Sequence, residues 1–176
     1  MDPVVDTILR GALALLWLSS AAHKVRDLAG FRAAVADYEI VPEGVTLPAA
    51  GALAAAELAT GIALLAPPTR SLGLLASALL LTLFAAAIGA NLLRGRRHID
   101  CGCAGPARRQ PVSGWLVARN SLLAAIALSA LWPVRARALT WVDGVTVLAG
   151  VCAIAALYIA SDHLLAFVPA PARPRS

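Results

Sequence analysis

Charged side chains are scarce in this sequence. Only 14% of its 176 residues are Asp, Glu, Lys or Arg, whereas a soluble globular domain carries about 25%. Apolar residues make up 60% of the chain, and the mean hydropathy is +0.77. A water-soluble core of this size could not hide so much apolar surface. The composition therefore excludes an ordinary soluble domain and predicts that the chain contacts a lipid bilayer.

Aromatic residues are also few, at 5%, and no basic stripe is interleaved with them. The net charge is +5. The basic residues lie in short segments between apolar runs, where they are expected to flank a membrane and to meet anionic headgroups. The sequence therefore predicts no nucleic-acid partner.

Cysteine is rare as well, since the chain has three. That is too few for a disulfide scaffold, and the spacing lacks the paired clusters of a structural zinc site. Cys101 and Cys103 share one polar loop. Cys152 lies alone in an apolar run, and we expect it to be a small, buried apolar residue.

Long apolar runs dominate the rest of the chain. Each has about 18 to 22 residues, close to the roughly 20 that cross a bilayer as a helix. Because backbone groups in lipid must pair internally, these runs should be helical. We predict an all-α integral membrane bundle with four or five transmembrane helices, in one domain over residues 1–165 and a disordered Pro/Arg-rich tail over 166–176. The helices are expected near residues 4–22, 47–66, 72–93, 114–132 and 139–160.

A polar stretch separates the first two runs. Phe31, Val35 and Tyr38 are spaced so that they can share one face of a helix. The stretch is either a short amphipathic helix in the membrane interface or an ordinary loop with two aromatic residues.

Polar residues are predicted to gather on one side of the membrane. Successive helices alternate in direction, so the loops after the first and third runs share a side. That side collects His23, Lys24, Asn91, His98, Asp100, Cys101, Cys103, Arg119 and Asn120.

Glu57 lies near the middle of the second run, where a carboxylate is costly unless it is protonated or paired. Lys24, Arg119 or a backbone group could pair with it. It is either half of an ion pair that fixes helix packing, or a proton relay or polar contact for a quinone.

The loop sequence Cys101-Gly102-Cys103 suggests thiol–disulfide chemistry. A disulfide across one residue closes a small, strained ring that is readily reduced, and Gly102 supplies the freedom that closure needs. Positive charge nearby favours thiolate, while Asp100 opposes it slightly. The positive charge comes from Arg96, Arg97, His98, Arg108 and Arg109, with Lys24 and Arg119 as further candidates.

Two other interpretations stay open for the same residues. Cys101, Cys103 and His98 could form a partial site for copper, mercury or zinc in a metal transport or delivery protein. Alternatively, the thiols are passive and the chain is a membrane scaffold.

The opening of the chain resembles DoxX-like membrane proteins, through His23-Lys24 and Phe31, Tyr38 and Pro42, with Glu57 and Gly61 in the second run. The segment Asp100-Cys-Gly-Cys-Ala-Gly105, with Ser113 and Arg119-Asn120, resembles the methylamine-utilisation MauE branch. The likeness covers roughly residues 5 to 130. Ala104 departs from it, because an aromatic residue is often expected there.

This resemblance implies a DoxX-like four-helix core plus a C-terminal helix in the inner or plasma membrane. It implies help in maturing an extracytoplasmic redox enzyme, as for the disulfide-rich subunit of methylamine dehydrogenase, beside a thioredoxin-like partner. Cys101 and Cys103 would carry that role and could pass electrons on to a quinone. It places the cysteine loop on the outer face, whereas the excess of arginines on that side would place it in the cytoplasm by the positive-inside rule.

Overall fold

The structure is a computed structural model that describes residues 1–102 and 111–166, the side chains after residue 161 excepted. Within these ranges the chain is helical and contains no strand beyond an isolated bridge. The helices are α1 (Pro3–Arg26), α2 (Leu28–Asp37), α3 (Thr46–Leu65), α4 (Arg70–Leu93), α5 (Gly114–Ser129) and α6 (Trp141–Ala166), with short 3-10 helices η1 (Glu43–Val45) and η2 (Pro67–Thr69). The predicted all-α membrane bundle is confirmed.

Four helical segments are long and apolar enough to cross a membrane: Pro3–Arg26, Glu43–Leu65, Pro67–Leu93 and Trp141–Ser161. This agrees with a multi-pass membrane protein. The remaining predicted span, 114–132, corresponds to α5, which has 16 residues and is about 24 Å long. It ends before residue 132 because proline follows at position 133 and disfavours helical geometry just ahead of it.

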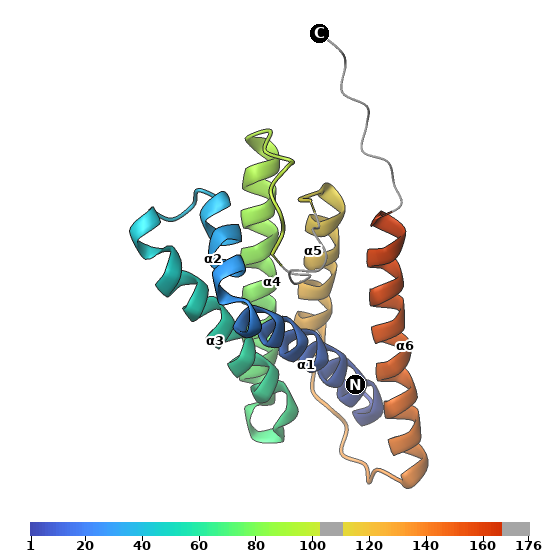
Figure 1. Cartoon of the computed structure of the whole chain (residues 1–176). Helices are drawn as coiled ribbons and strands as arrows, with labels where there is room; N and C mark the ends of the chain where they lie inside the picture. Colours follow the sequence, from blue (N-terminus) through green and yellow to red (C-terminus); the bar gives the residue numbers. More distant parts are fainter. Residues whose placement is uncertain (103–110, 167–176) are drawn as a thin grey trace.

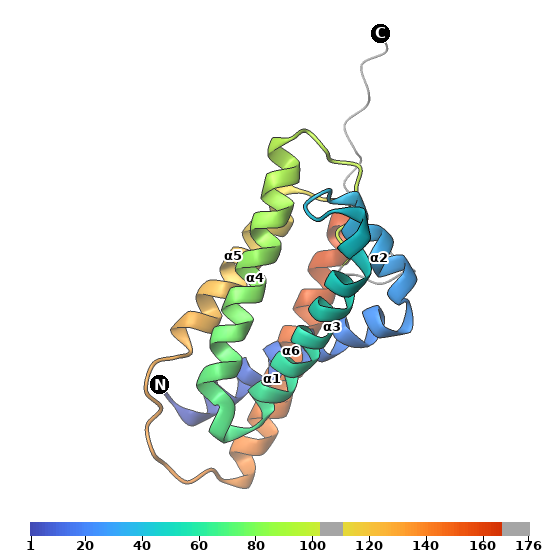
Figure 2. The ribbon, with the colours of Figure 1, turned by 90° about the vertical axis from the view of Figure 1, so that its left-hand side faces the viewer.

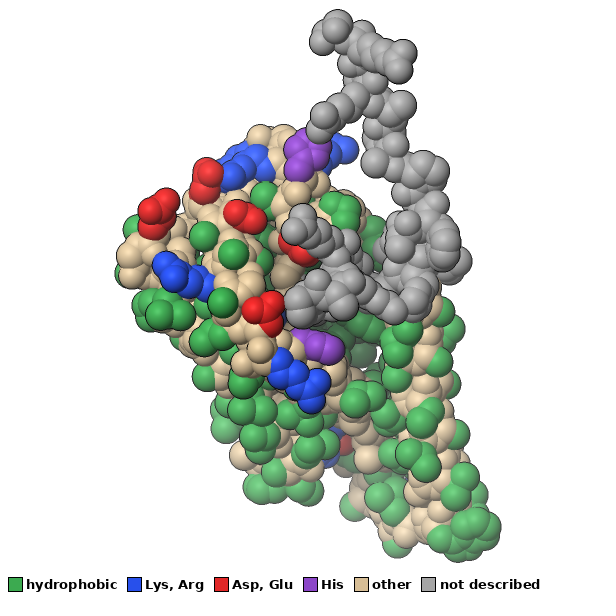
Figure 3. Space-filling model, in the orientation of Figure 1, with side chains coloured by type: hydrophobic (Ala, Val, Ile, Leu, Met, Phe, Trp, Pro, Cys, Tyr) green, Lys and Arg blue, Asp and Glu red, His purple; other side chains and the backbone are tan. Residues whose placement is uncertain are grey.

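The connections lie at two ends of the bundle (Figures 1 and 2). The α2–α3 connection and the start of the α4–α5 loop lie at one end. The α3–α4 turn and the α5–α6 connection lie at the other, where the Met1 amino group donates to the Pro133 carbonyl at 2.6 Å. On the face seen in Figure 3, charged side chains gather toward the first end, and hydrophobic ones cover the lower part and α6.

A buried charge network, which the sequence analysis did not anticipate, fixes the end that carries Met1. Asp6 is buried and forms ion pairs with Arg10 at 3.4 Å and Arg70 at 2.9 Å. Arg10 donates to the Leu64 carbonyl at 2.8 Å, and Arg70 donates to the Ala130 carbonyl. Carbonyls at helix C-termini lack intrahelical partners, so these arginines stabilise the ends of α3 and α5.

The apolar core lies between α1, α4 and α5. Trp17 is almost fully buried there, and its indole N–H donates to the Ser77 hydroxyl at 2.8 Å. Leu13, Leu74 and Leu81 pack in the same cluster.

Helix α6 packs on the bundle mainly through α1. A Cβ atom added at Gly150 would lie 2.7 Å from the Ile8 side chain, so glycine allows the close approach. The rest of the helix faces outward, and Cys152 is exposed. The expectation that Cys152 is buried was wrong, because α6 has one packed stripe and position 152 lies on its lipid-facing side.

Replacing Gly73 with Ala is expected to lower the free energy of unfolding by about 1–3 kcal/mol, the usual cost of overpacking. A Cβ atom there would lie 2.8 Å from the Leu64 backbone nitrogen, which cannot move aside. Thermal unfolding in one detergent, followed by circular dichroism, measures the difference. Gly89→Ala is the matched control in α4, because its Cβ atom would meet nothing within 4 Å. Equal transition temperatures for the two variants would contradict the packing described for α3 and α4.

Candidate functional site

The segment that carries Cys101 folds back against the bundle. Asp100 and Pro111 form an isolated antiparallel bridge, and the Val112 N–H donates to the Ile99 carbonyl at 3.1 Å. The Gly102 N–H donates to the Asp100 carboxylate at 3.2 Å. Gly102 has a φ of 71°, in the left-handed region where glycine is unstrained. Asp100 therefore shapes the turn at the cysteine segment.

Cys101 itself is only 7% exposed. It packs in a cluster with Ile88 of α4, Val112, and Leu116 of α5. This cluster anchors the segment between two helices that lie side by side in Figures 1 and 2.

Helix α2 forms a platform under the cysteine segment. A Cβ atom at Gly102 would lie 3.2 Å from the Ala34 Cβ atom and 3.5 Å from the Phe31 ring. The Tyr38 hydroxyl lies 3.5 Å from the Cys101 carbonyl, to which it donates. Of the two interpretations of this polar stretch, the helix is correct, and its buried residues Phe31 and Ala34 face inward.

A buried ion pair also lies next to Phe31. Lys24 is 3% and Glu57 0% exposed at the side chain, and the ammonium group donates to the Glu57 carboxylate. The Lys24 ammonium lies 4.6 Å from the centroid of the Phe31 ring and 5.0 Å from that of Phe84. Cation–π contacts of this kind gain strength when water is excluded. Of the partners expected for Glu57, Lys24 is the one that the structure provides.

One aromatic ring thus contacts both the cysteine segment and a buried charge. Phe31 contacts Gly102 on one hand and the Lys24 ammonium on the other. The sequence analysis did not single out Phe84, the second ring around Lys24. The sequence feature that could have indicated Phe84 is that it is the only aromatic residue in the run 72–93.

Other predicted site residues are buried in the same half of the bundle. Arg119 is buried, and its guanidinium group lies 4.8 Å from the Tyr158 ring centroid of α6. The buried polar atoms that lack a hydrogen-bond partner among the described residues include Glu57 Oε2, Asn91 Oδ1 and Asn120 Nδ2. Such atoms usually bind water.

The expected ring of positive charge is only partly described. Arg96 forms an ion pair with Glu39 at 2.6 Å, and His98 is exposed. Cys103, Arg108 and Arg109 lie outside the described residues. Within those residues, no three His, Cys, Asp or Glu side chains are grouped to hold a metal ion.

Comparison with known proteins adds the following. The sequence model of the family described as methylamine utilisation protein MauE matches residues 2–133. The methylamine utilization protein MauE of Paracoccus denitrificans is 39% identical over 129 residues, which cover 73% of this chain and 69% of that protein. The protein of the same name from Methylophilus methylotrophus is 33% identical over 172 residues, which cover 94% of this chain and 88% of that protein. No solved structure gives a significant match.

Proposed function

This chain belongs to the MauE family of methylamine utilisation proteins, and we propose that it exchanges disulfides with a partner protein at the membrane. The reacting group is the Cys101-Gly102-Cys103 segment. The partners are a thioredoxin-like protein and an extracytoplasmic redox enzyme that requires disulfide formation or maturation. By kinship with its relatives, the chain acts in methylamine utilisation. In this proposal the cysteine loop faces the outer side of the membrane, because the partner enzyme is extracytoplasmic.

The seating of Cys101 and Gly102 on α2 carries this proposal. Cys101 is buried between α4 and α5, while Gly102 lies against Phe31, whose ring also contacts the Lys24 ammonium. A cysteine segment held this way has a fixed geometry. Arg97 precedes Cys101 by four residues in the same loop, and positive charge near a thiol favours thiolate.

The burial of Cys101 assigns different tasks to the two sulfurs. An incoming thiolate needs access to the sulfur that it attacks, and Cys101 offers little. The partner thiolate therefore attacks Cys103, the bond between Cys103 and Cys101 breaks, and Cys101 leaves as a thiolate that takes up a proton. The partner's second thiolate then attacks its own bridging sulfur and releases the Cys103 thiolate. The partner gains a disulfide, and the pair ends as two thiols.

Lys24 and Glu57 support this chemistry as positioning residues. Their ion pair holds Phe31 and thereby the seat of Gly102. The unpartnered oxygen of Glu57 suits a bound water that could carry protons toward the segment.

Full-length protein in lipid nanodiscs provides the test, in a Cys152→Ser background that removes the exposed third thiol. We expect that the oxidised protein, mixed with a reduced thioredoxin-like protein, gains two alkylatable thiols while the partner loses two, as counted by mass spectrometry. The Cys101→Ser/Cys103→Ser double variant provides the control. A pair that remains reduced toward every disulfide offered would contradict exchange. Binding of stoichiometric copper or zinc without exchange would favour the metal-delivery alternative, and full maturation activity of the double variant would favour the scaffold.

Sidedness has its own experiment. A membrane-impermeant maleimide applied to intact cells is expected to label the reduced loop thiols. Labelling only after lysis would place the loop in the cytoplasm, as the arginine distribution suggests.

A further inference from the structure

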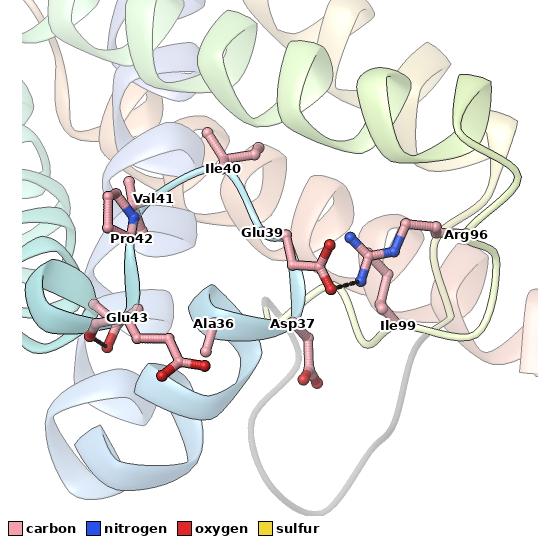
Figure 4. A pocket seen from close by; sticks show the side chains of 10 residues that line it. Ala36, Asp37, Glu39, Ile40, Val41, Pro42, Glu43, Arg96 and Ile99 are labelled. Carbon is pink, nitrogen blue, oxygen red and sulfur yellow. Dashed lines mark hydrogen bonds and ion pairs between the residues drawn. The ribbon is translucent and has the colours of Figure 1, made fainter.

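An open groove lies beside the cysteine segment, at the end of α2. It has a volume of about 610 Å³ and is bounded by the end of α2, the α2–α3 connection, the start of α3 and the start of the α4–α5 loop (Figure 4). Ile40, Val41, Pro42 and Ile99 supply apolar surface, and Ile40 is exposed. A smaller hollow of about 280 Å³ shares Ala36, Glu43 and Thr46 with it, which extends the groove along α2.

The groove is negatively charged, although the chain as a whole is positive. Asp37, Glu39 and Glu43 line it, against one cation, Arg96. Arg96 is already engaged with Glu39 at 2.6 Å (Figure 4). Neither Asp37 nor Glu43 forms an ion pair with any residue in the described part of the chain. Two carboxylates are thus available to an incoming cation.

Arg32 lines the smaller hollow and supplies the one opposing charge there. Its guanidinium Nε donates to the Thr46 hydroxyl at 3.2 Å. This bond holds Arg32 against the start of α3, and among the described residues Arg32 forms no ion pair with Asp37 or Glu43.

The wall of the groove is held in a strained backbone conformation. Glu39 has a φ of 47°, the only positive value among the non-glycine residues described. Residues other than glycine adopt such angles at an energetic cost, and they are enriched at functional sites. The ion pair with Arg96 ties this residue to the loop that leads to Cys101.

The groove adjoins the segment that carries Cys101. Ile99 lines it and precedes Cys101 by two residues, so their Cα atoms lie at most about 7 Å apart. A polypeptide bound in the groove would therefore hold a neighbouring cysteine of its own close to the pair.

We infer that this groove docks a partner polypeptide segment that carries a basic and an apolar side chain next to its reactive cysteine. The inference rests on the proposed exchange function and names the chemistry of the partner. The basic side chain pairs with Asp37 and Glu43, and the apolar one contacts Ile40 and Ile99. General attraction would give the opposite preference, because the net charge of +5 and the arginines of the loop favour an acidic segment.

Three peptides test the inference on full-length, reduced protein in the Cys152→Ser background. They have the sequences Lys-Leu-Gly-Cys, Gln-Leu-Gly-Cys and Glu-Leu-Gly-Cys, each joined through its cysteine to thionitrobenzoate. Attack by a protein thiolate on the peptide sulfur transfers the peptide and releases coloured thionitrobenzoate, whose appearance gives the rate. At low ionic strength we expect the lysine peptide to react about fivefold faster than the glutamate peptide. The difference should shrink in 0.5 M salt, an ionic strength at which surface charges are screened.

Charge variants test whether the groove carboxylates cause the faster reaction of the lysine peptide. Asp37→Asn/Glu43→Gln should bring the ratio of the two rates to about one or below, and Asp37→Lys/Glu43→Lys should reverse it. Val25→Lys/Leu93→Lys changes the net charge by the same two positive units as Asp37→Asn/Glu43→Gln, but at exposed positions outside the groove. It should keep the wild-type ratio of the two rates. A wild-type ratio at or below one, or a ratio unchanged in Asp37→Asn/Glu43→Gln, overturns the docking role.

Two further outcomes separate the remaining explanations. If no peptide releases thionitrobenzoate, exchange itself fails and the docking role falls with it. If the lysine preference holds in phosphatidylglycerol nanodiscs but disappears with phosphatidylethanolamine, the headgroup amine is the occupant and the peptide assignment is overturned.

Discussion

The Cys101→Ser variant is expected to accumulate a mixed disulfide with its partner, whereas Cys103→Ser should accumulate none. In the first variant Cys103 still attacks a partner disulfide and releases one partner thiolate. The neighbouring thiol that would break the new bond is missing. Since intramolecular groups react with a large effective concentration, the mixed disulfide should last on the order of tenfold longer than in the wild-type protein. In the second variant the remaining sulfur belongs to a residue that is 7% exposed.

Non-reducing electrophoresis of acid-quenched, alkylated membranes measures the adduct, with Cys152→Ser as the common background. Cys152 faces outward from α6, and its removal prevents adducts unrelated to the loop. Equal adducts in both single variants would show that burial of Cys101 does not set the order of attack. An adduct confined to Cys103→Ser would reverse the assigned roles.

Replacing Lys24 with Met is expected to lower the free energy of unfolding by about 3–5 kcal/mol, the usual cost of removing one partner from a buried pair. The Glu57 carboxylate is fully buried and would lose the ammonium that neutralises it. Lys24 also contacts two aromatic rings, so the variant loses both cation–π contacts as well. The double variant Lys24→Met/Glu57→Leu removes both charges and should recover most of the loss, because an apolar pair needs no neutralisation.

Thermal unfolding of the four proteins of this double-mutant cycle, in one detergent, gives the coupling between the residues. The exchange rate with a small disulfide separates positioning from stability. If Lys24 positions the cysteine segment through Phe31, the double variant should be folded yet exchange more slowly than the wild-type protein. A double variant as unstable as Lys24→Met alone would contradict the account of the buried pair.

The sequence correctly predicted the all-α membrane class, and each predicted span overlaps a helix of the structure. Long apolar runs have one stable backbone solution in lipid, so their composition suffices. Helix α5 ends at Ser129, earlier than the expected residue 132. The apolar run continues to Trp132, but the proline at 133 disfavours helical geometry just before it. Periodicity also identified Phe31 and Tyr38 as a possible helical face, which became α2.

The candidate site was predicted less completely. The alternating direction of the helices predicted that Lys24 and Cys101 lie on one side of the membrane. It could not predict that Phe31 contacts both the Lys24 ammonium and the cysteine segment. Glu57 was an evident functional or structural residue because a carboxylate in an apolar run must be paired. Three possible partners fitted that rule equally, and sequence separation gave no means of choosing among them. The burial of Cys152 was predicted wrongly for a related reason. Apolar neighbours in the sequence are expected both for a residue that faces lipid and for one in the protein interior.

By itself, then, the sequence determined that the chain spans a membrane, that Lys24 and the cysteine loop fall on the same side, and that two sulfurs share a short loop. These are consequences of local composition and connectivity, which act within a single segment. Only the tertiary structure decided that Lys24 neutralises Glu57, that Cys101 is enclosed between α4 and α5, and that an acidic groove adjoins it. Each of these depends on how helices far apart in sequence rotate and tilt against one another, and side-chain packing between the helices sets those angles.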